Sequence, residues 1–320
     1  NEENITVKET LQKEINSSIG TAFEVLRSRI DKFGVTQPNI QRIGNSGRIQ
    51  IELPGAKDIE RVTKLITSKA ELQFWEVYTN AEVQGYFFEV NSIVAELLKD
   101  TTVSEKEEDT VIKDDIDDLL GETKDSTNVN QKNLFTYLYP NVAQSQQQMS
   151  SLVAQARVID TATVNNLLKR KELQALLPKE LKYVKFLWDY KSSKGTDGSE
   201  LINLYAIKGS RNGKASIEGD VILDASQVFD QLNKPEVSMT MNSSGTKQWA
   251  KMTTKNQGKF VAVVLDNYVY TAPSVNTPIT GGRTSISGGS MTIAEAEDIS
   301  TVLKAGKLPA AARIIQIEVV

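Results

Sequence analysis

The sequence predicts a mixed α+β protein built from a ferredoxin-like split βαβ base, an inserted α+β head and an additional, largely helical insert. Three observations predict this class. The chain has 320 residues, which is enough for about two domains of ordinary size. Apolar residues change from helical to strand spacing and back again before Asn80. A strongly acidic stretch near residue 100 then interrupts the regular pattern.

A first helix is expected over residues 8–33. Gly34 follows it, where a left-handed C-cap is expected. The apolar residues of this segment recur at spacings of three and four, which is typical of one buried helix face. They are Ile19, Phe23, Leu26, Ile30 and Phe33.

Two strands and a second helix follow the first helix. Residues 39–43 and 48–53 flank a Gly-Asn-Ser-Gly turn, and Ile49, Ile51 and Leu53 alternate with polar residues, which predicts a hairpin with one buried face. Asp58 can then cap a second helix, and residues 71–78 form a further strand.

The order helix, strand, strand, helix, strand is that of a ferredoxin-like unit without its first strand. The predicted base consists of residues 1–78 together with about 290–320.

The insert is predicted over residues 79–180. Residues 100–125 contain eleven acidic residues and three lysines, so we expect a solvated, mobile acidic loop over about 100–132. Residues 133–178 are expected to be mainly helical.

The head is predicted over residues 181–289. We expect strands and one helix in an α+β arrangement, followed by the closing elements of the base. The expected strands are 182–190, 201–208, 221–229, 236–241, 259–265 and 268–271, the head helix is 247–254, the Gly-rich return is 281–289, and the closing helix and strand are 292–305 and 312–320.

Composition excludes several classes of function. The chain has no cysteine and no histidine, so disulfides, thiolate nucleophiles and the commonest transition-metal ligands are absent, and we expect no cofactor and no metal. A net charge of −4 lacks the basic footprint of a nucleic-acid-binding protein. The longest apolar strand run, Phe260 to Leu265, is too short to span a bilayer. The chain begins with Asn1 and ends on an expected strand, which favours a piece of a larger protein.

One set of motifs suggests an enzyme. Ser244 to Lys247 fits S-x-x-K, Ser274 to Asn276 fits S-x-N, and Lys304 to Gly306 approximates K-T-G, in the order found in penicillin-recognising serine–lysine acyl transferases. Each motif also has a structural explanation: Ser243 or Ser244 can cap a helix, and Lys304 with Gly306 can end one. We therefore expect no enzyme. The acyl transferase and a free-standing extracytoplasmic binding protein remain the alternatives.

Val237, Met239 and Met241 alternate along one expected strand of the head. Such alternation favours a core position, although methionine also suits surfaces that accept varied partners. They are our candidates for contact with a polypeptide partner, through strand addition at an exposed edge.

Three stretches together resemble the SecD family of bacterial export proteins. The first is Ala22 to Val35 with Arg48 to Gly55, the second is Met241 to Gly245 with Val261 to Asp266 and Val269 to Pro273, and the third is Ile279 to Gly282 with Ile286 to Gly288, Ala294 to Asp298 and Leu303 to Ala310. The motif residues to which we assign structural roles are Gly34, Pro54, Gly55, Asp266, Pro273, Gly281, Gly282, Gly306 and Pro309.

The resemblance implies the first large extracytoplasmic (periplasmic) domain of SecD, or of a fused SecDF protein, in the inner membrane. It implies unfolded preprotein, the SecYEG channel and SecF as partners, and membrane contact only through transmembrane helices that this sequence lacks. It also implies that the head swings on the base, driven by proton flow through the missing membrane part. The Gly-Gly strand that normally precedes this region is missing, and the insert is larger than in the simplest members.

The expected hinge lies at the two crossings between base and head. These crossings are Val77, Tyr78, Thr79 and Asn80 on one side and Ser287, Gly288 and Gly289 on the other. Glycine tolerates the large changes in φ and ψ that hinge motion requires.

Overall fold

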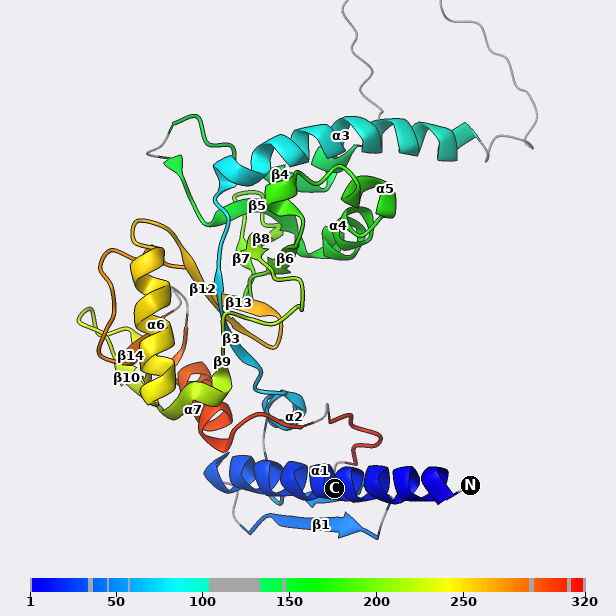
Figure 1. Ribbon diagram of the computed structural model, residues 1–320, viewed down its shortest axis with the longest axis vertical. Helices are drawn as coiled ribbons and strands as arrows, with labels where there is room; N and C mark the ends of the chain where they lie inside the picture. The colour runs from blue at the N-terminus through cyan, green and yellow to red at the C-terminus, as the bar shows by residue number, and fades with distance from the viewer. Residues whose placement is uncertain are drawn as a thin grey trace, which may run out of the picture. The chain divides into compact units, whose positions relative to one another are not determined.

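A computed structural model describes residues 2–33, 37–44, 46–56, 58–103, 133–145, 148–287, 291–309 and 312–318 (Figure 1). The chain forms two compact units. Unit 1 comprises Asn1–Val77, Leu187–Tyr190 and Ile207–Val320, and unit 2 comprises Tyr78–Phe186 and Lys191–Ala206. Unit 1 thus joins the first part of the chain to most of the expected head. The three-part division into base, insert and head stays a prediction.

Unit 1 begins with the long helix α1 (Glu2–Phe33), which starts earlier than expected. The predicted hairpin is confirmed as β1 (Asn39–Ile43) and β2 (Arg48–Glu52), with Ile43 opposite Arg48. Helix α2 (Ile59–Thr67) follows, and the predicted cap is confirmed because the Asp58 side chain accepts from the Arg61 amide at 2.9 Å.

A four-stranded sheet in the order β13-β12-β3-β9 forms the centre of unit 1. Its strands are β3 (Leu72–Glu76), β9 (Ile217–Glu218), β12 (Val261–Leu265) and β13 (Tyr268–Thr271). All five residues of β12 are buried. Its pairing with β3 places one apolar strand beside another.

This pairing corrects the expected ferredoxin-like base sheet. Among the described residues, β1 and β2 form a two-stranded sheet of their own, and β3 belongs to the central sheet instead. The reason is burial: Leu72, Phe74 and Trp75 of β3 are almost fully buried, whereas β1 and β2 are mostly exposed. A strand that is apolar on both faces needs neighbours that cover both faces.

A second sheet of unit 1 has the order β10-β11-β14. Its strands are β10 (Ile222–Phe229), β11 (Pro235–Met241) and β14 (Arg283–Ile286), the last lying within the expected Gly-rich return. Helix α7 (Ile293–Ala305) packs on β10 and β11, and helix α6 (Ser243–Lys255) packs on β11 and β9 (Figure 1). Asn242 caps α6, which corrects the expected serine cap, because its side chain accepts from the Gly245 amide at 2.7 Å.

Arg29 ties α1 to two other helix ends of unit 1. Its side chain is fully buried, and its guanidinium donates to the carbonyls of Leu65 at 3.0 Å, Ser68 and Gly306 at 3.1 Å. Burial lowers the pKa of Arg29 to about 10, and the charge of Asp266 opposes this shift, so the guanidinium stays charged at neutral pH. One side chain therefore satisfies backbone acceptors at the ends of α2 and α7.

Asp266 holds the same region from the other side. It occupies the β12–β13 turn with a φ of 51°. Its carboxylate accepts from the Ser68 hydroxyl at 2.7 Å and from the amides of Lys69 at 3.0 Å and Glu71 at 2.9 Å. Asp266 and Arg29 together fix the segment that leads from α2 into β3.

Unit 2 contains α3 (Asn80–Val103) and most of a sheet in the order β4-β5-β8-β6. Tyr86 and Phe87 of α3 and Phe186 form an aromatic cluster in it, with ring centroids 5.6 to 6.2 Å apart. Its strands are β4 (Leu138–Pro140), β5 (Leu152–Arg157), β6 (Val184–Trp188), β7 (Ser193–Lys194) and β8 (Glu200–Lys208). Its shorter helices are α4 (Thr161–Leu168), α5 (Lys171–Gln174) and the 3₁₀ turns Leu134–Thr136, Val158–Asp160 and Lys179–Leu181. A further 3₁₀ turn, Gly219–Val221, belongs to unit 1.

Two expectations about the insert and the end of the chain need correction. Strands β4 and β5 occupy part of the segment expected to be mainly helical, because β5 buries Val153, Ala154 and Ala156 and pairs with β4 and β8 in a sheet. The expected strand at 312–320 has no strand partner over the described residues 312–318. Gly34, Gly288, Gly289 and most of the acidic loop, residues 104–132, lie outside the described residues.

Candidate functional site

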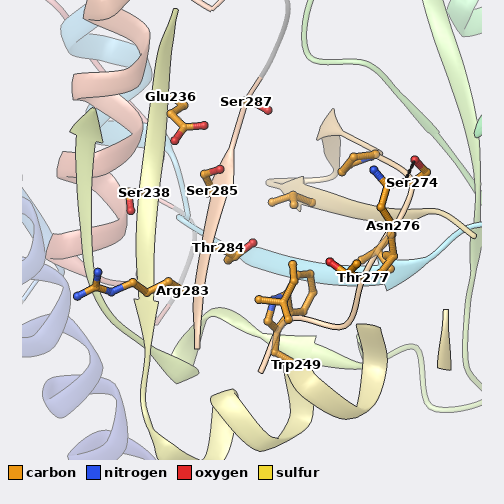
Figure 2. A pocket seen from close by; sticks show the side chains of 15 residues that line it. Glu236, Ser238, Trp249, Ser274, Asn276, Thr277, Arg283, Thr284, Ser285 and Ser287 are labelled. Carbon is orange, nitrogen blue, oxygen red and sulfur yellow. Dashed lines mark hydrogen bonds between the residues drawn. The ribbon is translucent and has the colours of Figure 1, made fainter. Parts of the chain in front are cut away.

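A cavity of about 480 Å³ opens beside β14 in unit 1 (Figure 2). We call it the β14 cavity. It lies between β14 on one side and the segment 273–279 on the other. Its lining comprises Glu236, Ser238, Trp249, Val261, Val263, Pro273, Ser274, Val275, Asn276, Thr277, Ile279, Arg283, Thr284, Ser285 and Ser287.

The local sequence explains why the cavity stays open. Gly282, with a φ of +67°, leads into β14, and the Gly282 carbonyl accepts from the Met241 amide at 2.8 Å. On the far side, Val275 pairs with residues 257–259 through backbone hydrogen bonds of 2.8 Å. The Ile279 amide donates to the Thr253 hydroxyl at 3.0 Å. Both walls are thus held by hydrogen bonds to other elements of unit 1.

The lining of the cavity combines apolar and polar side chains. Trp249, Val275 and Ile279 supply apolar surface, and Trp249 also contacts Phe74, with ring centroids 4.9 Å apart. Glu236, Ser238, Ser274, Asn276, Arg283, Ser285 and Ser287 supply polar side chains (Figure 2). An apolar floor with polar groups around it is typical of ligand-binding and active sites.

Trp249 carries a polar atom that lacks a partner. Its side chain is 4% exposed, and its indole Nε1–H has no hydrogen-bond acceptor among the described residues. A buried donor without an acceptor costs about 1–3 kcal/mol. An oxygen atom that entered at the floor of the cavity would recover part of that free energy.

The predicted contact residues lie elsewhere. Val237 and Met239 are 0% exposed and Met241 is 4% exposed, and all three belong to the core of unit 1. Strand β11 is paired on both sides, with β10 and β14. The alternation therefore marks core positions, and these side chains offer no surface for a polypeptide in this structure.

The three enzyme-like motifs do not converge. Ser274 and Asn276 line the β14 cavity, but Ser244 and Lys247 do not. The Ser244 hydroxyl accepts from the Gln248 side chain at 3.1 Å, and no hydrogen bond joins it to Lys247 among the described residues. Lys304 instead pairs with Asp224 at 3.1 Å. A serine nucleophile needs a base within hydrogen-bond reach, so this geometry does not favour the acyl transferase.

The hinge candidates fall in two different settings. One boundary between the units lies between Val77 and Tyr78. Thr79 caps α3 through hydrogen bonds with Glu82 of 2.7 and 3.1 Å, and Asn80 is buried and bonded to Gln148 and Ser150. Ser287 belongs to unit 1, as do the residues before and after it.

Several motif residues occupy turns that favour glycine or proline. Gly55 has a φ of +75° in the turn that follows Pro54, and Gly306 has a φ of +88° at the end of α7. Pro273 lines the β14 cavity, Gly281 is exposed beside Gly282, and Pro309 lies in a bend near the end of the described chain.

Sequence reasoning missed β14 and Trp249 as parts of a site. The apolar Ile286 and the polar residues before it were a weak strand signal, because the strand has only four residues. Trp249 and Met252 are both buried residues of α6, and an apolar residue on a helix gives no sign in the sequence that it borders a cavity.

None of the described helices combines the length and apolar content that a bilayer-spanning segment requires.

Two family models match this chain. Residues 205–310 match the P1 head subdomain of SecDF, and residues 19–79 match the N-terminal P1 domain of the protein translocase subunit SecDF. Both lie almost entirely in unit 1, and together they cover more than half of the chain.

Curated relatives agree with these matches. The protein translocase subunit SecD of Rhodothermus marinus is 40% identical over 312 residues, which is 96% of this chain and 47% of that protein. SecD of Desulfurispirillum indicum is 28% identical over 93% of this chain and 40% of that protein, and SecDF of Thermus thermophilus is 40% identical over 36% of this chain and 15% of that protein. The chain thus spans about half the length of the full-length SecD relatives it matches.

Solved structures of SecDF are also similar. A structure described as a membrane component SecDF that enhances protein export is 25% identical, covers 95% of this chain and 94% of its own, and has a TM-score of 0.47. SecDF in a super-membrane-facing form is 25% identical over 94% of this chain and 28% of that chain, with a TM-score of 0.48. On the family matches and the curated relatives, this chain belongs to the SecD/SecDF family of protein translocase subunits and corresponds to the periplasmic P1 domain.

Proposed function

We propose that this P1 domain assists protein export by holding an extended stretch of unfolded preprotein in the β14 cavity. The observation that carries the proposal is an open cavity of about 480 Å³ with an apolar floor, in a protein of a translocase family. Its volume lies within the roughly 300–1,000 Å³ that is usual for binding pockets. Contact of this kind needs no catalytic group, which fits a chain without histidine or cysteine.

The proposed partners rest on the family. The curated relatives are named protein translocase subunits. We therefore propose that the domain lies on the periplasmic side of the inner membrane and works with the SecYEG channel and with SecF, fused or separate. The acyl transferase is not favoured, because its motifs do not meet in the cavity.

Site-specific photocrosslinking tests the contact. A photoreactive amino acid at the exposed Ser274 or Thr277 of the full-length protein should capture a stalled preprotein, because both residues line the cavity. The same amino acid at Lys247, an exposed residue of α6 outside the cavity, is the matched control and should capture little. Capture at Lys247 equal to that at Thr277 would place the contact elsewhere.

We also propose that the head moves against the base during export, driven by proton flow through the membrane part of the whole protein. Thr79 and Asn80 are held within unit 2 by hydrogen bonds to Glu82, Gln148 and Ser150, so we assign the hinge on this side to Val77 and Tyr78. These two residues lie between the end of β3 and the start of α3. Hinges absorb their dihedral change over a few loop or element-terminal residues.

Distances between spin labels test this motion. One label at Lys247 in the head and one at Lys64 in the base should give two distance populations whose ratio changes when the proton gradient is applied. A control pair inside the head, at Lys247 and Lys234, should give one narrow population under both conditions. A single, gradient-independent distance between head and base would contradict the proposed motion.

A further inference from the structure

We infer that the polypeptide in the β14 cavity binds as an added β-strand on the free edge of β14, an inference that rests on the proposed function. The first step is the phase of the β11–β14 ladder. The Met241 amide donates to the Gly282 carbonyl at 2.8 Å, so these two residues form a hydrogen-bonded pair. In an antiparallel ladder such pairs alternate with pairs that exchange no hydrogen bonds.

The register then shows which backbone groups of β14 face the cavity. Thr284 lies opposite Met239 and Ile286 opposite Val237, so these residues continue the hydrogen-bonded set. Arg283 and Ser285 alternate with them and direct their N–H and C=O groups away from β11. No strand pairs with β14 on that side among the described residues.

These edge groups specify the chemistry of the partner. Donors and acceptors spaced as in a strand are complementary to another extended backbone, and an unpaired edge is a ready template for one. Both edge residues, Arg283 and Ser285, line the β14 cavity, so the space that such a strand would occupy is open. A folded protein or a small molecule would leave most of these groups unmatched.

The walls of the cavity add a side-chain preference. Successive side chains of an added strand point to opposite faces. One set would face the apolar side chains of Trp249 and Ile279, and the other would face the polar surface that includes Ser238. The inferred ligand is therefore an extended segment in which apolar residues alternate with residues of any polar type, read mainly through its backbone.

A pair of backbone-methylated peptides tests the mode of binding. The parent peptide alternates valine with threonine, has lysines at both ends for solubility, and carries a fluorophore. One analogue is N-methylated at its threonines and the other at its valines. Because the valines must face the apolar side of the cavity, only the valine amides or only the threonine amides can face β14. The two analogues carry equal numbers of methyl groups, so they are matched controls for each other.

Binding to the full-length protein is measured by fluorescence anisotropy. We expect one analogue to lose about tenfold or more in affinity and the other to bind like the parent, since two lost hydrogen bonds of about 0.5–1.5 kcal/mol each amount to about that factor. Loss of affinity on methylating the threonines indicates antiparallel addition, because the peptide residue opposite Ser285 then points to the same, polar face as Ser285. Loss of affinity on methylating the valines indicates parallel addition. Equal affinities of the two analogues would overturn strand addition and leave the proposed function standing. Failure of the parent peptide to bind would overturn both.

Discussion

Replacing Gly282 by alanine is expected to destabilise unit 1 by about 3 kcal/mol, through two separate effects. Gly282 has a φ of +67°, a conformation that costs an L-residue roughly 1–2 kcal/mol. An added Cβ would also overlap the Thr246 hydroxyl and lie 3.1 Å from the Thr246 Cβ. The clash is with the first turn of α6, which packs against the core and cannot shift freely. Urea unfolding followed by circular dichroism measures the effect.

Two further variants separate the effects. Gly281→Ala is the matched control, because a Cβ there meets nothing within 4 Å and the backbone has no left-handed φ; it should change stability by less than about 0.5 kcal/mol. The double variant Gly282→Ala/Thr246→Gly removes the clash and keeps the backbone cost. Compared with the sum of the two single substitutions, it should recover about half of the stability that Gly282→Ala loses. Equal stabilities of Gly282→Ala and Gly281→Ala would contradict the role assigned to Gly282.

Replacing Arg29 by methionine is expected to destabilise unit 1 by about 3–5 kcal/mol, the range for removing one partner of a buried charged network. Methionine fills similar space but donates no hydrogen bonds, so the carbonyls of Leu65, Ser68 and Gly306 would lose their shared donor. The free energy of unfolding, again from urea titration, is the measurement. The last turns of α2 and α7 should also exchange their amide hydrogens faster than in the unchanged protein.

Two substitutions serve as controls for this prediction. Arg27 lies on the same helix, is more than half exposed and pairs with the exposed Asp31 at 4.0 Å, so Arg27→Met should cost less than about 1 kcal/mol. Arg29→Lys keeps the charge but replaces a planar fork with a single ammonium, and it should recover only part of the loss. If Arg29→Met proves as stable as Arg27→Met, the guanidinium contacts do not hold the helix ends together.

The local elements were largely predictable because their signals are local. The apolar spacing of residues 19–33 predicted α1, the Gly-Asn-Ser-Gly turn predicted the β1–β2 hairpin, and Asp58 predicted the start of α2. Each depends on residues a few positions apart. The family resemblance also held, since its motifs lie in the two matched segments.

The pairing of distant strands was not predictable in the same way. Strand β3 pairs with β12, almost two hundred residues later, and period-two alternation gives no partner for a strand that is apolar on both faces. The site was missed for the same reason. Its walls are Thr284 and Ser285 on one side and Ser274 and Asn276 on the other, polar residues whose role appears only when the sheet places them around Trp249.

The fully buried strand β12 has a consequence for the chain before it folds. Val261 to Leu265 is a run of high β-propensity and no charge, which is the composition of segments that self-associate when exposed. Lys259 precedes this run and Asp266 follows it, so a charge stands close to each end. Charged residues in these positions act as gatekeepers against aggregation. Asp266 therefore has two roles. In the unfolded chain its charge opposes self-association of the strand before it, and in the folded chain its carboxylate accepts hydrogen bonds from the segment after α2.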